Sequence, residues 1–309
     1  MRTTARGREG ESMGGACMSE QYLLGMYEKA LPAELGWSER LSEARKAGFD
    51  YVEMSIDETD ERLTRLDWSI TQRRDLTHMM DETGVPVGSI CLSGLRRFPF
   101  GHPDKDVRYR SLKVMGDTIN LASDLGIRII MIPGYDVYYE KASDETRVRF
   151  LQTLSRAVDM AAYAGVSLGF ETMETPFMDT VGKAMHYVDL VDSPYLGVYP
   201  DLGNVSNACL ATGESVAKDI RKGAGHIFAA HCKETSEGRY REVPYGTGTT
   251  DYEGSLLELA RMGVRRYVAE FWYTGSEAWR DDAGFASTFV RRRIDAAFDE
   301  VLASATCVA

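Results

Sequence analysis

The stretch SDETRVRFLQTLSRAVDMAAYAGVSLGFET (residues 143–172) contains one complete helix–strand unit, and the rest of the chain repeats this pattern. Its first part is a long amphipathic segment that ends in Gly165, as an α-helix does. VSLGFET (166–172) follows directly. It is short and apolar, as a strand that is covered on both faces should be. The stretch therefore predicts a helix followed by a buried parallel strand.

Seven further strand-like segments lie between residue 20 and the C-terminus: YLLGMY (22–27), YVEMSI (51–56), VPVGSICL (85–92), RIIMIPG (128–134), YLGVYPD (195–201), HIFAAHCK (226–233) and RYVAEFW (266–272). Helical segments fill the gaps. SITQRRDLTHMMDETG (69–84) has a Ser69–Gln72 capping box and ends at Gly84, and the chain closes with a helix over 282–304. Eight strands, each followed by a helix, predict the α/β class and a (β/α)₈ TIM barrel. A doubly wound open sheet is the alternative, although no G-x-G-x-x-G follows the first strand.

The domain organisation follows from composition. With 44% hydrophobic and 27% charged residues, the chain has the composition of a globular protein. No linker or composition break divides it, so we expect a single barrel domain over residues 20–309. Residues 1–19 lack both periodicity and an apolar stretch, which predicts a disordered tail and no secretory signal, with Met18 as an alternative start. No run of about 18 apolar residues is present, so we expect no membrane-spanning segment.

Charge and cysteine content narrow the classes of partner. The net charge of −11 disfavours nucleic acid and anionic membranes, whereas a small phosphorylated ligand needs only a local basic pocket. The glycine-rich YGTGTTD (245–251) is a weak candidate for an anion cradle. Five cysteines, an odd number without C-x-x-C spacing, indicate reduced thiols and a cytoplasmic protein, and they argue against a disulfide framework or a cysteine zinc site.

Polar side chains end four consecutive predicted strands. Glu171 ends the fifth strand and Asp201 the sixth, while His231 and Glu270 lie near the ends of the seventh and eighth. In a barrel these strand ends meet around one mouth. Any one of them alone would be read as a satisfied polar residue, but three converging carboxylates repel one another unless a cation neutralises them. The pattern predicts one divalent metal site, for Mn²⁺, Zn²⁺, Mg²⁺ or Co²⁺.

Candidate substrate-binding residues lie near the same mouth. Lys233 follows His231 by two positions, so strand alternation directs both side chains to the same side. Arg96 and Arg97, on the loop after the third strand, form either a phosphate-binding pair or a solvated loop. Asn204, in YPDLGN (199–204), completes the set of candidates.

Six stretches of the chain resemble one known enzyme family. They are GMYEKALP (25–32), GFDYVEMSIDETDERLTRLDWS (48–69), SICLSGLRRFPFG (89–101), IPGYDVYYEKASDETR (132–147), YPDLGN (199–204) and GHIFAAHCKE (225–234). Together they resemble the L-ribulose-5-phosphate 3-epimerases, also called L-xylulose-5-phosphate 3-epimerases, of the xylose-isomerase-like barrel superfamily. The resemblance covers essentially residues 20–300. VEMSIDETDERL (52–63) is specific to this group, whereas the four-ligand metal pattern is shared across the superfamily.

The resemblance implies an isomerase that interconverts L-ribulose 5-phosphate and L-xylulose 5-phosphate by two-base proton transfer at C3, through a cis-enediolate. It implies Glu171, Asp201, His231 and Glu270 as metal ligands, with Glu171 and Glu270 also as the catalytic pair. Mn²⁺ or Zn²⁺ is the expected ion, with Mg²⁺ or Co²⁺ as alternatives. A cytoplasmic role in L-ascorbate degradation is typical of the family, and a homodimer is compatible with it. FETMETPFM (170–178) and FWYTGS (271–276) differ from the residues that are commonest in the family around two of the ligands, which leaves the identity of the sugar substrate open.

Two alternatives stay open. One is a related isomerase or epimerase of the superfamily that acts on a non-phosphorylated ketose or a keto acid. The other is a barrel that binds a metal or ligand without turnover, against which the two glutamates at the mouth argue. An abasic-site endonuclease shares the fold, but its three-metal site needs more histidines and a charge of −11 opposes DNA binding.

Overall fold

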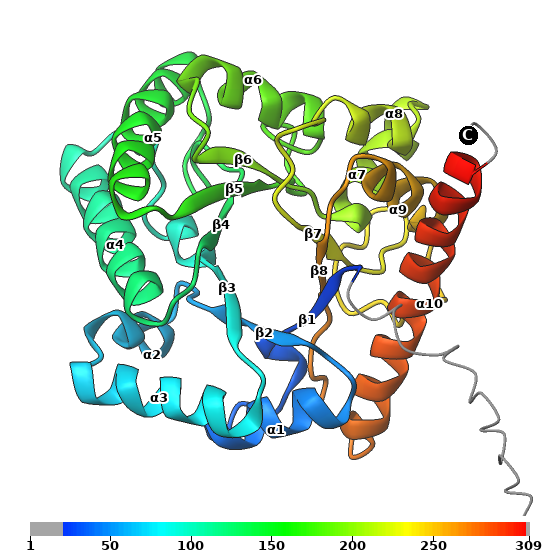
Figure 1. Cartoon of the computed structure of the whole chain (residues 1–309). Helices are drawn as coiled ribbons and strands as arrows, with labels where there is room; N and C mark the ends of the chain where they lie inside the picture. Colours follow the sequence, from blue (N-terminus) through cyan, green and yellow to red (C-terminus); the bar gives the residue numbers. More distant parts are fainter. Residues whose placement is uncertain (1–20, 307–309) are drawn as a thin grey trace, which may run out of the picture.

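The computed structural model describes residues 21–306, which form a (β/α)₈ barrel (Figure 1). In this part of the chain the eight strands are β1 (Leu23–Tyr27), β2 (Tyr51–Ser55), β3 (Val87–Cys91), β4 (Ile129–Pro133), β5 (Ser167–Glu171), β6 (Leu196–Tyr199), β7 (Ala230–Cys232) and β8 (Arg266–Ala269). Each lies within a predicted strand segment, so the predicted barrel is confirmed. The predicted N-terminal tail (1–19) lies outside the described residues.

The strands are parallel and follow the order β6-β5-β4-β3-β2-β1-β8-β7. Two isolated parallel bridges, Val198–Ile227 and Asp201–His231, join β6 to the β7 segment and bring the ring close to closure. Parallel neighbours place all carboxyl ends on one face. The second bridge sets Asp201 beside His231, so the contact that closes the barrel also brings two predicted ligands together.

Helices surround the strands (Figure 1). Those of the described residues are α1 (Trp37–Lys46), α2 (Asp60–Leu63), α3 (Ile70–Thr83), α4 (Lys105–Asp124), α5 (Asp144–Ala164), α6 (Val181–Val191), α7 (Leu202–Thr212), α8 (Val216–Arg221), α9 (Tyr252–Arg261) and α10 (Trp279–Thr306), with 3₁₀ turns η1 (Glu28–Ala30), η2 (Thr64–Asp67) and η3 (Ser93–Arg96). The Ser69 hydroxyl accepts the Gln72 N–H at the start of α3, as the capping box predicted. Gly84 and Gly165 end α3 and α5 with φ of 68° and 67°, a conformation that favours glycine.

The barrel encloses a small core of its own. Seven buried side chains fill the lumen: Tyr27, Tyr51, Cys91, Met131, Tyr199, Ala229 and Val268. A Cβ on Gly25 or Gly88 would collide with the Tyr51 ring, so glycine on β1 and β3 makes room for it. A larger apolar core joins the strands to the surrounding helices. The packed lumen forms a floor, above which the strand ends open to the mouth.

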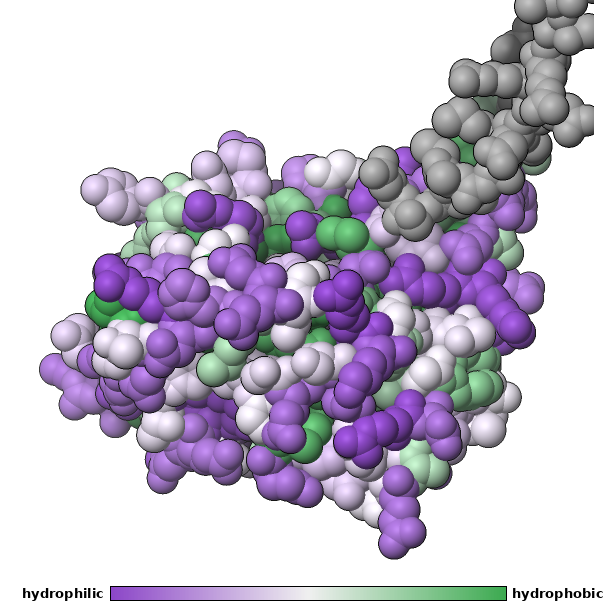
Figure 2. All heavy atoms as spheres, turned by 60° about the horizontal axis from the view of Figure 1, so that its bottom comes forward, coloured by the Kyte–Doolittle hydropathy of each residue, from purple (hydrophilic) through white to green (hydrophobic). Residues whose placement is uncertain are grey.

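The face of the barrel that Figure 2 shows is mostly polar. On this face, hydrophilic side chains predominate and hydrophobic ones are scattered among them. Within residues 21–306, no helix combines the length and the apolarity that a membrane span requires.

Candidate metal centre and active site

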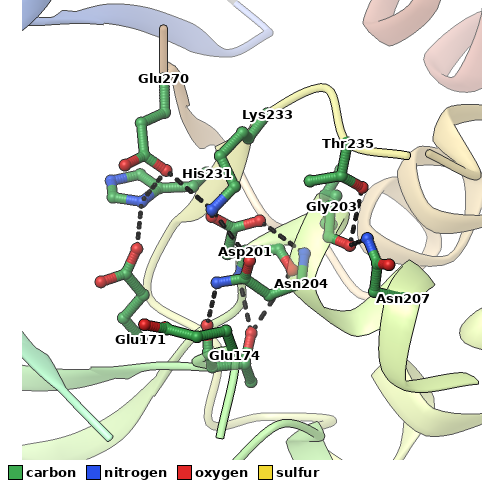
Figure 3. A network of polar contacts seen from close by, with 12 residues as sticks. Glu171, Glu174, Asp201, Gly203, Asn204, Asn207, His231, Lys233, Thr235 and Glu270 are labelled. Atoms are coloured by element: carbon green, nitrogen blue, oxygen red, sulfur yellow. Dashed lines mark hydrogen bonds and ion pairs between the residues drawn. The ribbon is translucent and has the colours of Figure 1, made fainter. Parts of the chain in front are cut away.

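The four predicted ligands converge at the mouth of the barrel (Figure 3). Glu171 is the last residue of β5 and Asp201 is the N-cap of α7. His231 is the central residue of β7, and Glu270 directly follows β8. One ligand atom of each residue lies within 4.8 Å of the others, and all four residues are buried. The fold therefore assembles three carboxylates and one imidazole in one cluster.

Asp201 is held in place by the start of α7. One carboxylate oxygen, Oδ1, accepts the Asn204 N–H at 2.9 Å, and the Asp201 N–H donates to Thr172 Oγ1 at 2.9 Å. Asn204 Nδ2 donates to the Thr172 carbonyl at 2.8 Å. The cap therefore uses one oxygen of Asp201 and leaves Oδ2 to face the cluster.

Two buried carboxylate oxygens of the cluster, Asp201 Oδ2 and Glu270 Oε2, have ion-pair contacts with Lys233 and His231 but no well-oriented hydrogen bond among the described residues. Buried polar atoms are normally paired, because an unpaired one keeps its desolvation cost. A cation would bind both oxygens. Three carboxylates and one imidazole are ligands that Mn²⁺, Zn²⁺, Co²⁺ and Mg²⁺ accept, so the residues fit a divalent metal.

The electrostatics of the cluster are those of crowded like charges. Burial raises the pKa of Glu171, and Glu270 adds to the effect against the opposing influence of His231. Burial likewise raises the pKa of Asp201, although Lys233 opposes it. Burial also disfavours ionisation of Glu270, but Lys233 and His231 outweigh it and lower its pKa. Positive charge at the mouth thus decides which carboxylates ionise easily.

Lys233 and Asn204 belong to the same cluster. Lys233 is 4% exposed, and its Nζ donates to Asn204 Oδ1 at 2.9 Å. The same Nζ lies 2.5 Å from Asp201 Oδ2 and 3.7 Å from Glu270 Oε2. Strand alternation therefore directs Lys233 toward the mouth, on the side that His231 also faces, as the sequence predicted.

A cavity of about 370 Å³ lies over the cluster, with Glu171, Lys233 and Glu270 in its lining. Tyr27, Met173 and Trp272 supply apolar wall. Four further cations also line it: Lys29, Arg96, Arg239 and Arg241. A cavity of this size, with a few convergent polar groups, suits a small-molecule substrate.

The two arginines predicted to bind phosphate lie in different places. The Arg96 guanidinium carbon is 4.7 Å from the centre of the Tyr138 ring, and its Nε is buried without a hydrogen-bond partner among the described residues. Arg97 instead donates to Asp60 Oδ1 at 2.6 Å on the exterior and does not line the cavity. Consecutive residues at the end of turn η3 point in different directions, so only Arg96 remains a candidate.

The glycine-rich segment 245–251 cradles an anion that belongs to the chain. The buried Glu234 carboxylate accepts the Gly246 N–H at 2.8 Å and the Thr250 N–H at 3.2 Å. These donors are consequently not available to a substrate. The predicted anion cradle exists, but its anion is Glu234.

Four residues around the site were not predicted from the strand ends: Glu53, Lys29, Arg239 and Arg241. Glu53, in the middle of β2, is fully buried, and its Oε1 lies 2.6 Å from His231 Nε2. The sequence did mark Glu53, because it is an acidic residue within the otherwise apolar strand segment YVEMSI (51–56). Lys29 follows the end of β1 by two residues, so the rule used for strands five to eight would also have found it. No sequence signal marked Arg239 and Arg241, which lie in the loop between β7 and α9.

Comparisons with known proteins agree with this geometry. Residues 41–289 match the model of the xylose isomerase-like TIM barrel family. L-ribulose-5-phosphate 3-epimerase UlaE of Salmonella heidelberg (strain SL476) is 44% identical over 281 residues, which cover 91% of this chain and 98% of the relative. The UlaE of Escherichia coli (strain SMS-3-5 / SECEC) is 44% identical over 278 residues, 90% of this chain and 96% of the relative.

Solved structures show the same fold at much lower identity. A D-psicose 3-epimerase from Clostridium cellulolyticum H10, solved with D-tagatose, superposes with a TM-score of 0.73 at 18% identity, covering 88% of this chain and 99% of the other. An L-ribulose 3-epimerase superposes with a TM-score of 0.69 at 20% identity, covering 93% of this chain and 98% of the other. These likenesses support the barrel fold alone.

Proposed function

This chain belongs to the xylose isomerase-like TIM barrel family and, within it, to the L-ribulose-5-phosphate 3-epimerases, and from this we propose that it interconverts L-ribulose 5-phosphate and L-xylulose 5-phosphate. The observation that carries the proposal is the pair Glu171 and Glu270, which both reach Nδ1 of His231, Glu270 from above and Glu171 from below in the view of Figure 3, beneath a substrate-sized cavity. Glu171 Oε1 lies 3.1 Å and Glu270 Oε2 3.2 Å from His231 Nδ1.

Epimerisation at C3 needs two proton-transferring groups. The C3 proton of a 2-ketose is acidified by the neighbouring carbonyl, and its removal gives a planar enediolate. One carboxylate takes the proton from one face, and an acid on the other face returns a proton with inversion. Glu171 and Glu270 come from β5 and β8, which β6 and β7 separate in the ring, so their side chains enter from different directions. Their roles exchange with the direction of reaction.

The metal ligands in this proposal are Glu171, Asp201, His231 and Glu270. The cation, when bound, supplies Lewis-acid polarisation of the substrate carbonyl and so acidifies the adjacent C–H bond. We propose Mn²⁺ or Zn²⁺, with Mg²⁺ or Co²⁺ as alternatives. Lys233 and Asn204 bind sugar oxygens beside the reacting carbon, because their polar atoms share the cluster.

The phosphate binds to cations of the cavity wall. In a protein of net charge −11, a phosphorylated ligand needs a local concentration of positive side chains. Lys29 and Arg96 line the cavity and come from loops after β1 and β3, and Arg239 and Arg241 line it from the loop after β7. Arg96 is also held in place, because its guanidinium lies over the Tyr138 ring and its Nη1 is 3.8 Å from Glu58 Oε1, which makes it the best-positioned candidate of the four.

A cytoplasmic location and a homodimer complete the proposal. Cys91, Cys209 and Cys232 are buried free thiols, which fit a reducing compartment. Sedimentation of the purified protein tests the dimer.

The test of function is an assay of the Mn²⁺-loaded protein against a panel of phosphorylated and free ketoses. We expect C3 epimerisation, with kcat/KM highest for L-ribulose 5-phosphate and L-xylulose 5-phosphate. Equal or better turnover of the free ketoses would instead favour the non-phosphorylated alternative. A folded, metal-loaded protein that turns over none of the panel would favour the non-catalytic barrel.

A further inference from the structure

Glu53 is a charged side chain in the packed floor of the barrel. It lies at the centre of β2, it is fully buried, and its neighbours in the lumen include Tyr51, Cys91 and Tyr199. A carboxylate in such a place is costly unless it is hydrogen-bonded. The two-base chemistry gives it no task, because it lies below the mouth, on the far side of His231 from Glu171 and Glu270.

His231 lies between Glu53 and the mouth carboxylates. Its Nδ1 faces Glu171 Oε1 and Glu270 Oε2, at 3.1 Å and 3.2 Å. Its Nε2 faces Glu53 Oε1, at 2.6 Å. The imidazole therefore presents one nitrogen to the mouth and the other to a carboxylate in the floor.

We propose that Glu53 is a positioning residue that sets the orientation and the tautomer of His231 for metal binding; this rests on the proposed function above. A neutral imidazole binds a metal through the nitrogen that carries the lone pair, while its other nitrogen carries the proton. The Glu53 carboxylate accepts a hydrogen bond from Nε2–H, which keeps the proton on Nε2 and leaves the lone pair on Nδ1. Hydrogen bonds of this kind, from a ligating histidine to a carboxylate, commonly strengthen metal binding.

Glu53 is itself fixed, which a positioning role requires. Its Oε2 accepts the Ser89 hydroxyl at 2.7 Å and the Tyr199 hydroxyl at 3.0 Å. With Oε2 bound by two donors, Oε1 is held toward the histidine. The Tyr199 ring also packs edge-on against the His231 ring, with centroids 4.9 Å apart. Strands β2, β3 and β6 thus hold the ring of a residue on β7.

The test compares the Mn²⁺ affinity of the wild type with those of Glu53→Gln and Glu53→Met, measured calorimetrically without sugar. We expect Glu53→Met, which replaces the carboxylate with a thioether that is only a weak acceptor, to bind Mn²⁺ about 10–100-fold more weakly. Glu53→Gln keeps an acceptor oxygen and should lose less. Tyr267→Phe is the matched control, because it removes a buried tyrosine hydrogen bond, to the Val264 carbonyl, that involves neither His231 nor Glu53. Its affinity should stay within a few-fold of the wild type.

A folded Glu53→Met that binds Mn²⁺ with wild-type affinity would overturn the proposal. If that variant fails to fold, the tautomer in the Zn²⁺-loaded wild type decides, read by long-range ¹H–¹⁵N spectra with His231→Ala used for assignment. We expect the proton of His231 on Nε2, and a proton on Nδ1 would refute the proposal. Neither measurement uses turnover. A protein that shows both results yet epimerises no ketose would leave this inference standing and overturn the proposed function.

Discussion

Two buried charged clusters of this barrel balance their charge in opposite ways. At the mouth, three carboxylates gather around His231 and Lys233 (Figure 3). Beside β1, a single carboxylate, that of Glu28, faces three arginines: Arg40, Arg62 and Arg65. The first cluster has an excess of acid and the second an excess of base.

The Glu28 carboxylate is satisfied by the chain itself. Glu28 Oε2 accepts from Arg65 Nη1 at 2.6 Å and from the Ser55 N–H at 2.9 Å. Glu28 Oε1 accepts from Arg65 Nη2 at 2.7 Å and from Arg62. Although burial opposes ionisation, Arg65, Arg62 and Arg40 lower the pKa of Glu28 to about 2. These contacts connect the end of β1 to the segment after β2.

The difference separates structure from function. Each Glu28 oxygen has its donors, so this cluster stabilises the fold. At the mouth, Asp201 Oδ2 and Glu270 Oε2 have ion-pair contacts with Lys233 and His231 but no well-oriented hydrogen bond among the described residues, and three carboxylates are held together against their repulsion. Removing a charge from the Glu28 cluster should therefore cost stability, whereas removing one from the mouth cluster should cost metal binding and catalysis.

The largest expected effect is on catalysis at the mouth. Glu270→Gln, supplied with excess Mn²⁺, should lower kcat for C3 epimerisation by roughly 10²–10⁴-fold, because it removes one of the two proton-transferring groups. Steady-state kinetics measure the loss. Glu277→Gln, the same substitution at an exposed position in the following loop, is the control and should leave kcat unchanged. Near-normal kcat in metal-loaded Glu270→Gln would remove this glutamate from the mechanism.

The next largest effect is on the stability of the fold, and it concerns the Glu28 cluster. The pKa of Glu28 falls from 4.5 to about 2 on folding, which corresponds to about 3 kcal/mol at ~1.4 kcal/mol per unit. Since folding lowers this pKa, the stabilisation is complete above pH 4.5 and is lost as the pH falls toward 2. Urea unfolding of Glu28→Gln should therefore show a deficit near pH 7 that shrinks across this window.

Exposed Glu61→Gln is the matched control for that experiment, since it should unfold like the wild type. A deficit of Glu28→Gln that stays constant from pH 7 to pH 3 would contradict the charge account of the cluster.

Metal binding should stabilise the folded wild type slightly less than the ionised Glu28 carboxylate does. Mn²⁺ at about 100 times its Kd adds roughly 2.7 kcal/mol to the free energy of unfolding, and a chelator removes it. Differential scanning calorimetry should show this increment in the wild type and its loss in His231→Ala. Stoichiometric, tight Mn²⁺ binding by His231→Ala would overturn the ligand assignment.

The smallest effect concerns the phosphate. A charge-assisted hydrogen bond contributes roughly 1.5–3 kcal/mol, so Arg96→Ala should raise KM for L-ribulose 5-phosphate about tenfold or more. KM for free L-ribulose should change little. Arg97→Ala removes the neighbouring arginine, which pairs with Asp60 outside the cavity, and should leave both values unchanged. Equal effects of the two variants would place the phosphate elsewhere.

The sequence predicts the fold and the mouth cluster because both depend on local rules. Strand periodicity, helix caps and glycine stops locate the elements, and parallel strands in a ring bring their ends together. Glu171 and Asp201 could therefore be assigned without knowing any contact.

What the sequence could not predict depends on side-chain directions and on loops. Arg96 and Arg97 are adjacent in the chain, yet the end of turn η3 turns one toward the cavity and the other toward Asp60. The glycine-rich segment 245–251 had the composition of an anion site, and only the folded chain shows that Glu234 occupies it. The contact of Glu53 with His231 could not be predicted, because only the folded chain brings β2 opposite β7 across the lumen.

The central claim, that two glutamates transfer the C3 proton from opposite faces, is tested most directly by turnover in D₂O. The wild type, loaded with Mn²⁺ and given L-ribulose 5-phosphate, should form L-xylulose 5-phosphate that carries deuterium at C3, because the proton taken up and the proton returned pass through different carboxylates. Proton NMR of the product at C3 reads this out. Complete conversion to L-xylulose 5-phosphate without deuterium at C3 would contradict the two-base account.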